Sequence, residues 1–161
     1  MNTQIRCAQV ICTALLVSGM SASARLAARA HTAESKNAAL IEQAFEDGEQ
    51  GLRDIIDLLT PAAQWTVAGA RPITGTYLTR AAFLTQALGP VMVGLGSPIT
   101  PHIKKIVAQG DHVVVLWEGA ATLADGRHYE NSYAWHLQMH GGSITQITAF
   151  PDAERLVDPL H

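Results

Sequence analysis

The apolar positions along the chain change their period near residue 100. Before it they recur at the 3.6-residue spacing of amphipathic helices, which predicts helices over residues 34–48, 51–59 and 79–88. A short apolar run over residues 64–68 predicts a strand, and the Gly/Pro-rich stretch 69–76 predicts a loop. The first part of the chain is therefore expected to be mainly helical.

Residue types at the ends of these helices support the assignment. Gly48 ends the first helix and Pro61 ends the second. Thr79 is placed to cap the third helix at its N-terminus, and Gly89-Pro90 is expected to close it after Leu88.

From residue 101 onward, apolar and polar residues alternate between short turns that contain glycine. The alternation predicts four strands, over residues 103–109, 112–122, 128–139 and 144–150. Helices followed by an antiparallel meander predict an α+β domain, with three N-terminal helices packed on one face of a curved, mainly antiparallel sheet. We assign this domain to residues 36–158.

The turn at Asp125-Gly126 allows a prediction of strand register. A two-residue loop pairs Ala124 with Arg127 and so places Glu118 opposite Tyr133. Glu118 would then lie on the inner face of the sheet together with the odd-numbered residues of the next strand. The even-numbered residues of that strand would face outward. A three-residue loop would reverse this parity on one strand. The predicted inner residues of the second strand of the hairpin are Tyr129, Asn131, Tyr133, Trp135 and Leu137, and the predicted outer apolar residues of the first are Val113, Val115 and Trp117.

The predicted inner face thus carries three polar groups among aromatic residues. Burial of Glu118, Asn131 and Tyr133 without partners would cost about 1–3 kcal/mol each. Two interpretations stay open. The groups form a self-satisfied polar cluster within the core, or they form the polar end of an apolar pocket in which Glu118, with a raised pKa, acts as a general base.

Several segments together resemble a known family. They are Trp65-Thr66-Val67-Ala68-Gly69, Pro72 to Tyr77, Asp125 to Tyr133, and the ending from Gly142-Ser143-Ile144 to Phe150-Pro151-Asp152. In this order they resemble the SnoaL-like, ketosteroid-isomerase-related branch of the nuclear transport factor 2-like superfamily, over residues 34–158. The resemblance implies a cone-shaped α+β fold with a pocket between sheet and helices, and often a homodimer formed through the outer face of the sheet.

The resemblance does not extend to the residues of a ketosteroid isomerase, which uses an aspartate base with a tyrosine and a protonated aspartate as donors. The base would fall near Thr66 or Val67, and neither is acidic. The first helix has no tyrosine near residues 43–45, and residues 132–134 include no carboxylate. Steroid isomerisation by that set of residues is not expected.

The remaining candidates define two hypotheses. In the first, the chain is a cofactor-independent lyase or isomerase in which Glu118, Tyr133 and Asp152 perform acid/base chemistry on a small hydrophobic molecule. In the second, it is a non-catalytic module that binds a small ligand or dimerises. Asp152 has the alternative role of a cap or of an ion-pair partner for Arg155. The residues expected to contact the ligand are Trp65, Tyr77, Tyr129, Asn131 and Trp135.

The N-terminus reads as an export signal. Arg6 precedes an apolar stretch, and Ala22-Ser23-Ala24 fits signal peptidase, so we expect residues 1–24 to be cleaved and the protein to be periplasmic or secreted. Retention as an uncleaved anchor is the alternative. Both cysteines, Cys7 and Cys12, would be lost, and residues 25–35 are expected to form a flexible leader.

The net charge and the spacing of the histidines argue against nucleic-acid binding and against a metal site. The net charge is −3 without a basic block, so a nucleic-acid partner is not expected. The chain has seven histidines, but His136 and His140 would stand about 13 Å apart on one strand, and His128 farther still. A metal site would need His102 or His112 to be brought in by folding, and we predict no metal and no cofactor.

Overall fold

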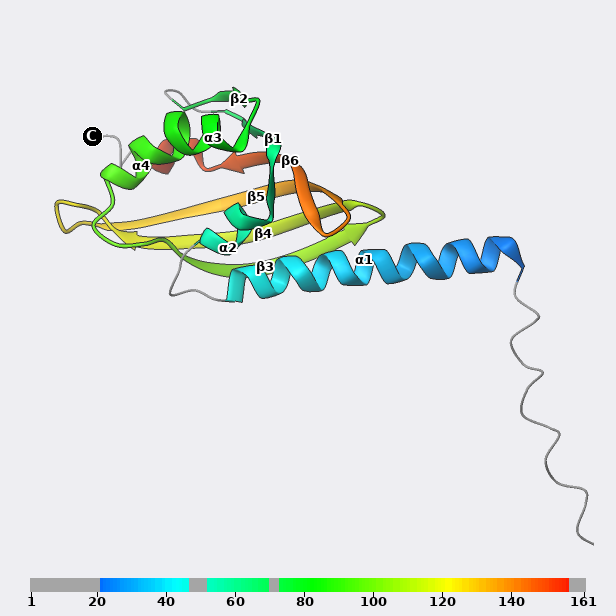
Figure 1. The fold of residues 1–161 in the computed structure, drawn as a ribbon. Helices are drawn as coiled ribbons and strands as arrows, with labels where there is room; N and C mark the ends of the chain where they lie inside the picture. Colours follow the sequence, from blue (N-terminus) through cyan, green and yellow to red (C-terminus); the bar gives the residue numbers. More distant parts are fainter. Residues whose placement is uncertain (1–20, 47–51, 70–72, 157–161) are drawn as a thin grey trace, which may run out of the picture.

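The computed structural model describes residues 21–46, 52–69 and 73–156 (Figure 1). Most of the predicted export signal therefore lies outside the described residues. In the described part, no helix is long and apolar enough to cross a membrane.

Two helices and a short strand pair form the first half of the fold. Helix α1 spans Ala22–Glu46, α2 spans Arg53–Leu58, β1 spans Leu59–Val67 and β2 spans Gly75–Tyr77. The predicted second helix is shortened because the chain extends at Leu59 and enters β1. The strand thus begins five residues earlier than predicted and includes Pro61.

Three helical segments follow without a break. They are α3 (Arg80–Phe83), the π-helical turn η2 (Leu84–Leu88) and α4 (Gly89–Val93). The predicted cap is confirmed, because the Ala82 N–H donates to the Thr79 hydroxyl at 3.1 Å. The predicted stop at Gly89-Pro90 is wrong. Pro90 lies in the first turn of α4, where a missing N–H costs no helical hydrogen bond, and the Gly89 N–H bonds to the Leu84 carbonyl across the wider π turn.

The four predicted C-terminal strands are present; the second has the predicted bounds, and the other three are slightly longer than predicted. They are β3 (Thr100–Gln109), β4 (His112–Thr122), β5 (His128–His140) and β6 (Ser143–Pro151), after which α5 spans Ala153–Leu156. The sheet has six strands in the order β2-β1-β6-β5-β4-β3. Only the β1–β6 pair is parallel among these strands, so the α+β class and the mainly antiparallel sheet are confirmed. The sheet is open rather than closed into a barrel.

The helices cover one face of this sheet. Helix α1 runs along β3, while α3 and α4 lie toward β1 and β2 (Figure 1). Ile41, Ala44 and Phe45 of α1 are buried, as the helical period predicted. The core is made by these side chains, by α2 to α4, and by one alternating set of residues from β1, β4, β5 and β6.

Helix α1 begins well before the predicted first helix. Residues 25–35, expected to form a flexible leader, are helical, and the N-terminal part of α1 extends past the sheet (Figure 1). Glu34 already contacts the body of the domain, because its carboxylate accepts the Gly110 N–H at 2.8 Å.

Candidate functional site

A small cavity of about 80 Å³ lies between the sheet and the helices. Aliphatic side chains of α2, η2, α4 and the β6 end form part of its wall. Five aromatic residues form much of the rest: Trp65, Phe83, Trp117, Tyr133 and Trp135. A cavity of about 150 Å³ is known to bind benzene, so this space suits a group of only a few non-hydrogen atoms.

The aromatic wall is one continuous set of ring contacts. Trp65 stacks on Phe83 with ring centroids 3.8 Å apart, and Trp117 stacks on Tyr133 at 4.1 Å. Trp135 joins the two stacks through edge contacts of 5.1 Å to Trp65 and 4.8 Å to Trp117. Such contacts add about 0.5–1.5 kcal/mol per pair beyond area burial, so the wall is a rigid part of the core.

This wall also contains unused hydrogen-bond donors. The indole Nε1 atoms of Trp65, Trp117 and Trp135 are all buried, and within the described residues none has a hydrogen-bond partner. Buried polar groups are normally paired with protein or water. Three rings that line one cavity therefore carry donors for which no described residue supplies an acceptor.

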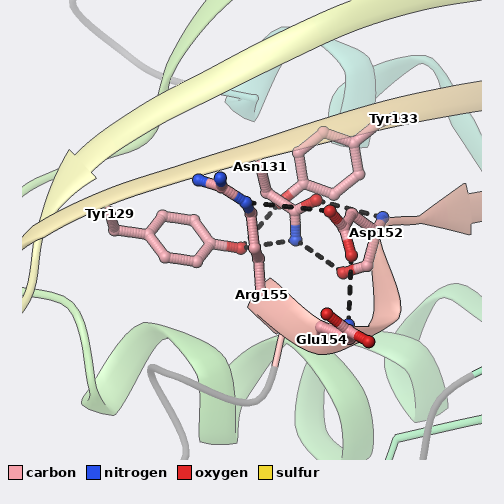
Figure 2. A network of polar contacts seen from close by, with 6 residues as sticks. All are labelled: Tyr129, Asn131, Tyr133, Asp152, Glu154 and Arg155. Atoms are coloured by element: carbon pink, nitrogen blue, oxygen red, sulfur yellow. Dashed lines mark hydrogen bonds and ion pairs between the residues drawn. The ribbon is translucent and has the colours of Figure 1, made fainter.

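A hydrogen-bond network lies beside the cavity on β5 (Figure 2). The Tyr129 and Tyr133 hydroxyls are 2.9 Å apart, and the Asn131 side-chain amide donates to Tyr129 at 3.1 Å. Asn131 also bonds the Asp152 backbone twice, accepting its N–H at 3.0 Å and donating to its carbonyl at 3.2 Å. Asn131 thereby joins the end of β6 to the middle of β5 and helps to hold the tyrosine pair in place.

Burial changes the acidity of two tyrosines. Loss of hydration raises the pKa of Tyr133 well above its ordinary value, with a further increase from the neighbouring Tyr129. Loss of hydration also raises the pKa of Tyr77. Tyr133 therefore stays protonated at neutral pH, where its hydroxyl can donate a hydrogen bond.

The predicted position of Glu118 is wrong. Glu118 pairs with Ser132 and not with Tyr133, so the register between β4 and β5 differs by one residue from the predicted register. The Asp125-Gly126 turn lies within a five-residue connection between Thr122 and His128, and an odd-numbered loop reverses the parity of one strand. Glu118 lies on the outer face, is about half exposed (53%), and pairs with Lys104 at 2.7 Å.

The same register change moves the apolar residues of β4 inward. Val113, Val115 and Trp117, predicted to face outward, are fully buried, and Trp117 is a cavity residue that the sequence analysis missed. A signal for it existed. The alternating set that contains Val113 and ends at Ala121 has no charged member, whereas the other set includes Glu118.

Asp152 takes the alternative role proposed for it. Its carboxylate is partly exposed (43%), lies 3.7 Å from Arg155 and accepts the Glu154 N–H at 3.1 Å. Its backbone lies beside Asn131, but the side chain is not part of the cavity wall.

The predicted ligand contacts divide into three groups. Trp65 and Trp135 line the cavity, as does Tyr133 from the catalytic set. Tyr129 and Asn131 are buried on the inner face but act in the network behind the wall. Tyr77 lies outside the wall, donates to the Ile73 carbonyl at 2.7 Å and contacts the Phe83 ring.

Gly119 makes room for the Trp117–Tyr133 stack. A Cβ at this position would lie 2.8 Å from an Ile99 methyl carbon, 2.9 Å from the Trp117 ring and 3.3 Å from the Tyr133 ring. The absence of a side chain is therefore required by close packing on the inner face.

The profile of the SnoaL-like domain matches residues 37–147. Among curated proteins, none matches the chain. Solved structures with similar folds include a nuclear transport factor 2-like protein from Burkholderia thailandensis E264, with a TM-score of 0.62 and 16% identity over 78% of this chain and 97% of that one.

Two further structures resemble this chain. One, from Jannaschia sp. CCS1, is described as a proposed SnoaL-like polyketide cyclase, with a TM-score of 0.62 and 13% identity over 80% of this chain and 93% of that one. The other is AclR, a proposed hydroxylase from Streptomyces galilaeus, with a TM-score of 0.63 and 15% identity over 79% of this chain and 85% of that one. At these identities the likeness supports the fold.

Proposed function

Because the chain belongs to the SnoaL-like domain family, we propose that it binds a small, neutral and largely apolar molecule in the cavity between sheet and helices. The observation that carries this proposal is the apolar wall of this cavity, three of whose rings carry buried indole N–H groups without an acceptor among the described residues. A ligand that brings one carbonyl or ether oxygen would satisfy a donor, and its hydrocarbon part would fill the remaining space.

The wall disfavours charged ligands. Within the described residues, its side chains are aliphatic or aromatic, and none is a carboxylate, a lysine or an arginine. An ion in such a site would lose its hydration without gaining an opposite charge, which is strongly unfavourable. The size of the cavity favours a molecule of only a few non-hydrogen atoms, or one such group of a larger molecule.

An acid/base enzyme is the second candidate function, and Tyr133 is the observation that favours it. Its hydroxyl remains protonated and lies against Tyr129, so it could donate to a developing oxyanion. The carboxylate bases expected from the sequence, Glu118 and Asp152, lie outside the wall. A lyase or isomerase of this kind would therefore depend on Tyr133, while Glu118→Gln and Asp152→Asn would leave its turnover unchanged.

A pair of isosteric probes tests the binding proposal. Acetone and isobutane each have four non-hydrogen atoms, but only the ketone offers an acceptor. The chain has three tryptophans, so every indole N–H signal in a proton–nitrogen NMR spectrum comes from this wall. We expect the ketone to shift at least one of these signals and to bind about fivefold more tightly than the hydrocarbon, as one net hydrogen bond predicts.

Tryptophan-to-phenylalanine variants provide the matched controls. Trp65→Phe, Trp117→Phe and Trp135→Phe each remove one N–H and keep an aromatic ring. At least one of them should abolish the preference for the ketone without weakening isobutane binding. Equal affinities for both probes in the unmodified chain would refute recognition by the indoles, and failure of both probes to bind would refute the proposal as a whole.

The proposal includes export and self-association. The pattern of residues 1–24 supports cleavage after Ala24, which the mass of the protein recovered from a bacterial periplasm would check against a start at Arg25. A second copy of this chain is the proposed partner of the outer sheet face, where Val107, Val114, Leu116 and Phe150 are exposed. The family resemblance supports this choice of partner.

A further inference from the structure

Folding brings together two histidines that are 24 residues apart in the sequence. His112 lies at the start of β4 and His136 in β5, both on the outer face of the sheet. His112 Nδ1 and His136 Nε2 are 3.0 Å apart, and the rings are nearly parallel, with an interplanar angle of 17° and centroids 5.1 Å apart. His112 is one of the two residues that the histidine spacing required for any metal site.

The separation of these nitrogens fits two ligands of one metal ion. Imidazole nitrogens bind such ions at about 2.0–2.1 Å, so two of them lie about 2.9 Å apart at a right angle and about 3.4 Å apart at a tetrahedral angle. The observed 3.0 Å is closer to the right angle. That geometry is typical of tetragonal copper(II) or nickel(II), and imidazole is a ligand that suits both ions.

The surroundings permit a dication at this position. The strand positions paired with His112 are Gln109 and Gln138, and those paired with His136 are Val114 and Thr148. None of these four side chains carries a positive charge. β4 and β5 are interior strands of the sheet, so hydrogen bonds on both sides hold their backbones in place.

We propose that His112 and His136 form a chelate site for a divalent transition metal ion with tetragonal preference, copper(II) or nickel(II), on the outer face of the sheet. Each imidazole then carries its proton on the other ring nitrogen, Nε2 of His112 and Nδ1 of His136, which frees the two facing lone pairs for the metal. In the described part of the chain, no third histidine, cysteine or carboxylate joins them, so water completes the coordination.

Titration of the untagged chain with copper(II) tests this site, with Cys7→Ser and Cys12→Ser introduced because free thiols bind and reduce this ion. We expect one high-affinity ion, with electron paramagnetic resonance showing coupling to two nitrogens. His112→Ala and His136→Ala should each weaken binding at least about tenfold and leave coupling to one nitrogen, since even loss of a group behind a metal ligand commonly costs 10–100-fold. His136→Gln removes the ligand while keeping a hydrogen-bonding side chain.

Other exposed histidines provide the matched control. His140 projects from the same face of β5 about 13 Å from His136, and His140→Ala should leave affinity and spectrum unchanged. Thermal unfolding of each variant without metal checks that the sheet is intact. If either alanine variant of the pair binds copper(II) within about twofold of the unmodified chain, or if the unmodified chain shows one-nitrogen coupling, the proposed site is refuted.

Discussion

Tyr133 is positioned by contacts on each side of its ring and at its hydroxyl. Trp117, its direct partner across β4 and β5, stacks on the ring, and Gly119 leaves the space that the ring occupies. Tyr129 fixes the hydroxyl at 2.9 Å, and Asn131 holds Tyr129. The Tyr133 side chain is therefore a preorganised hydrogen-bond donor beside an apolar cavity. This holds for a binding protein and for an enzyme alike.

The raised pKa of Tyr133 predicts a specific dependence of stability on pH. The unfolded chain releases the tyrosine proton near pH 10, whereas the folded chain retains it, so folding stability is fully present below pH 10 and decreases as the pH rises above it. We expect Tyr133→Phe to reduce the slope of unfolding free energy against pH, above about pH 10, by up to about 1.4 kcal/mol per pH unit.

Urea unfolding at several alkaline pH values measures this slope. Tyr77→Phe is the control, because the Tyr77 pKa is raised by burial alone and not also by a second tyrosine. A slope that Tyr133→Phe leaves unchanged would contradict the assignment of Tyr133 as a buried, protonated donor.

At the scale of elements, two side chains of α1 form hydrogen bonds with the sheet, and both bond to Gly110. The Glu34 carboxylate accepts the Gly110 N–H in the turn between β3 and β4, and the Asn37 amide donates to the Gly110 carbonyl at 3.4 Å. Before residue 33 the side chains of α1 are nearly all exposed. The domain therefore begins close to Glu34, inside the segment assigned to the leader.

This boundary predicts the effect of two changes in α1. Glu34→Ala removes a charged acceptor from a buried turn N–H and should lower the unfolding free energy by about 1–2 kcal/mol. Glu42→Ala, on an exposed position of the same helix, should change it by less than about 0.5 kcal/mol. Denaturant unfolding compares the two, and equal losses would place the boundary elsewhere.

The sequence predicted the elements better than their pairing. The four C-terminal strands and the buried residues of α1 follow from hydrophobic period alone, because burial on one face imposes that period. The site was predicted only in part. Trp65, Tyr133 and Trp135 were identified, but the odd number of residues in the turn after Thr122 placed Trp117, and not Glu118, on the inner face. Turn geometry depends on local hydrogen bonds such as that from the Leu123 N–H to Arg127, which strand alternation does not reveal.

At the scale of the whole molecule, the two faces of the sheet differ in chemistry. The inner face is filled with aromatic and aliphatic side chains around the cavity. The outer face combines four exposed apolar residues of β3, β4 and β6 with the Lys104–Glu118 ion pair and the histidine pair. Binding in the cavity and self-association would therefore use opposite faces, whereas the proposed metal site lies on the face proposed for self-association.

The outer face provides a test of the proposed homodimer. Leu116 is 43% exposed near the middle of this face, and Leu116→Lys would place a charge within any interface formed there. We expect sedimentation to show a dimer for the unmodified chain and a folded monomer for this variant. Leu78→Lys, at a 65% exposed leucine outside the sheet, is the control and should remain dimeric. A dimer that survives Leu116→Lys would show that another surface is used.

The grouping of every tryptophan of the chain around one cavity gives the molecule a shared chromophore. Trp135 lies within 5.1 Å of both other indole rings, so a ligand that enters the cavity changes the surroundings of all three fluorophores together. The optical spectrum of this protein is therefore a property of its cavity and not an average over separate residues.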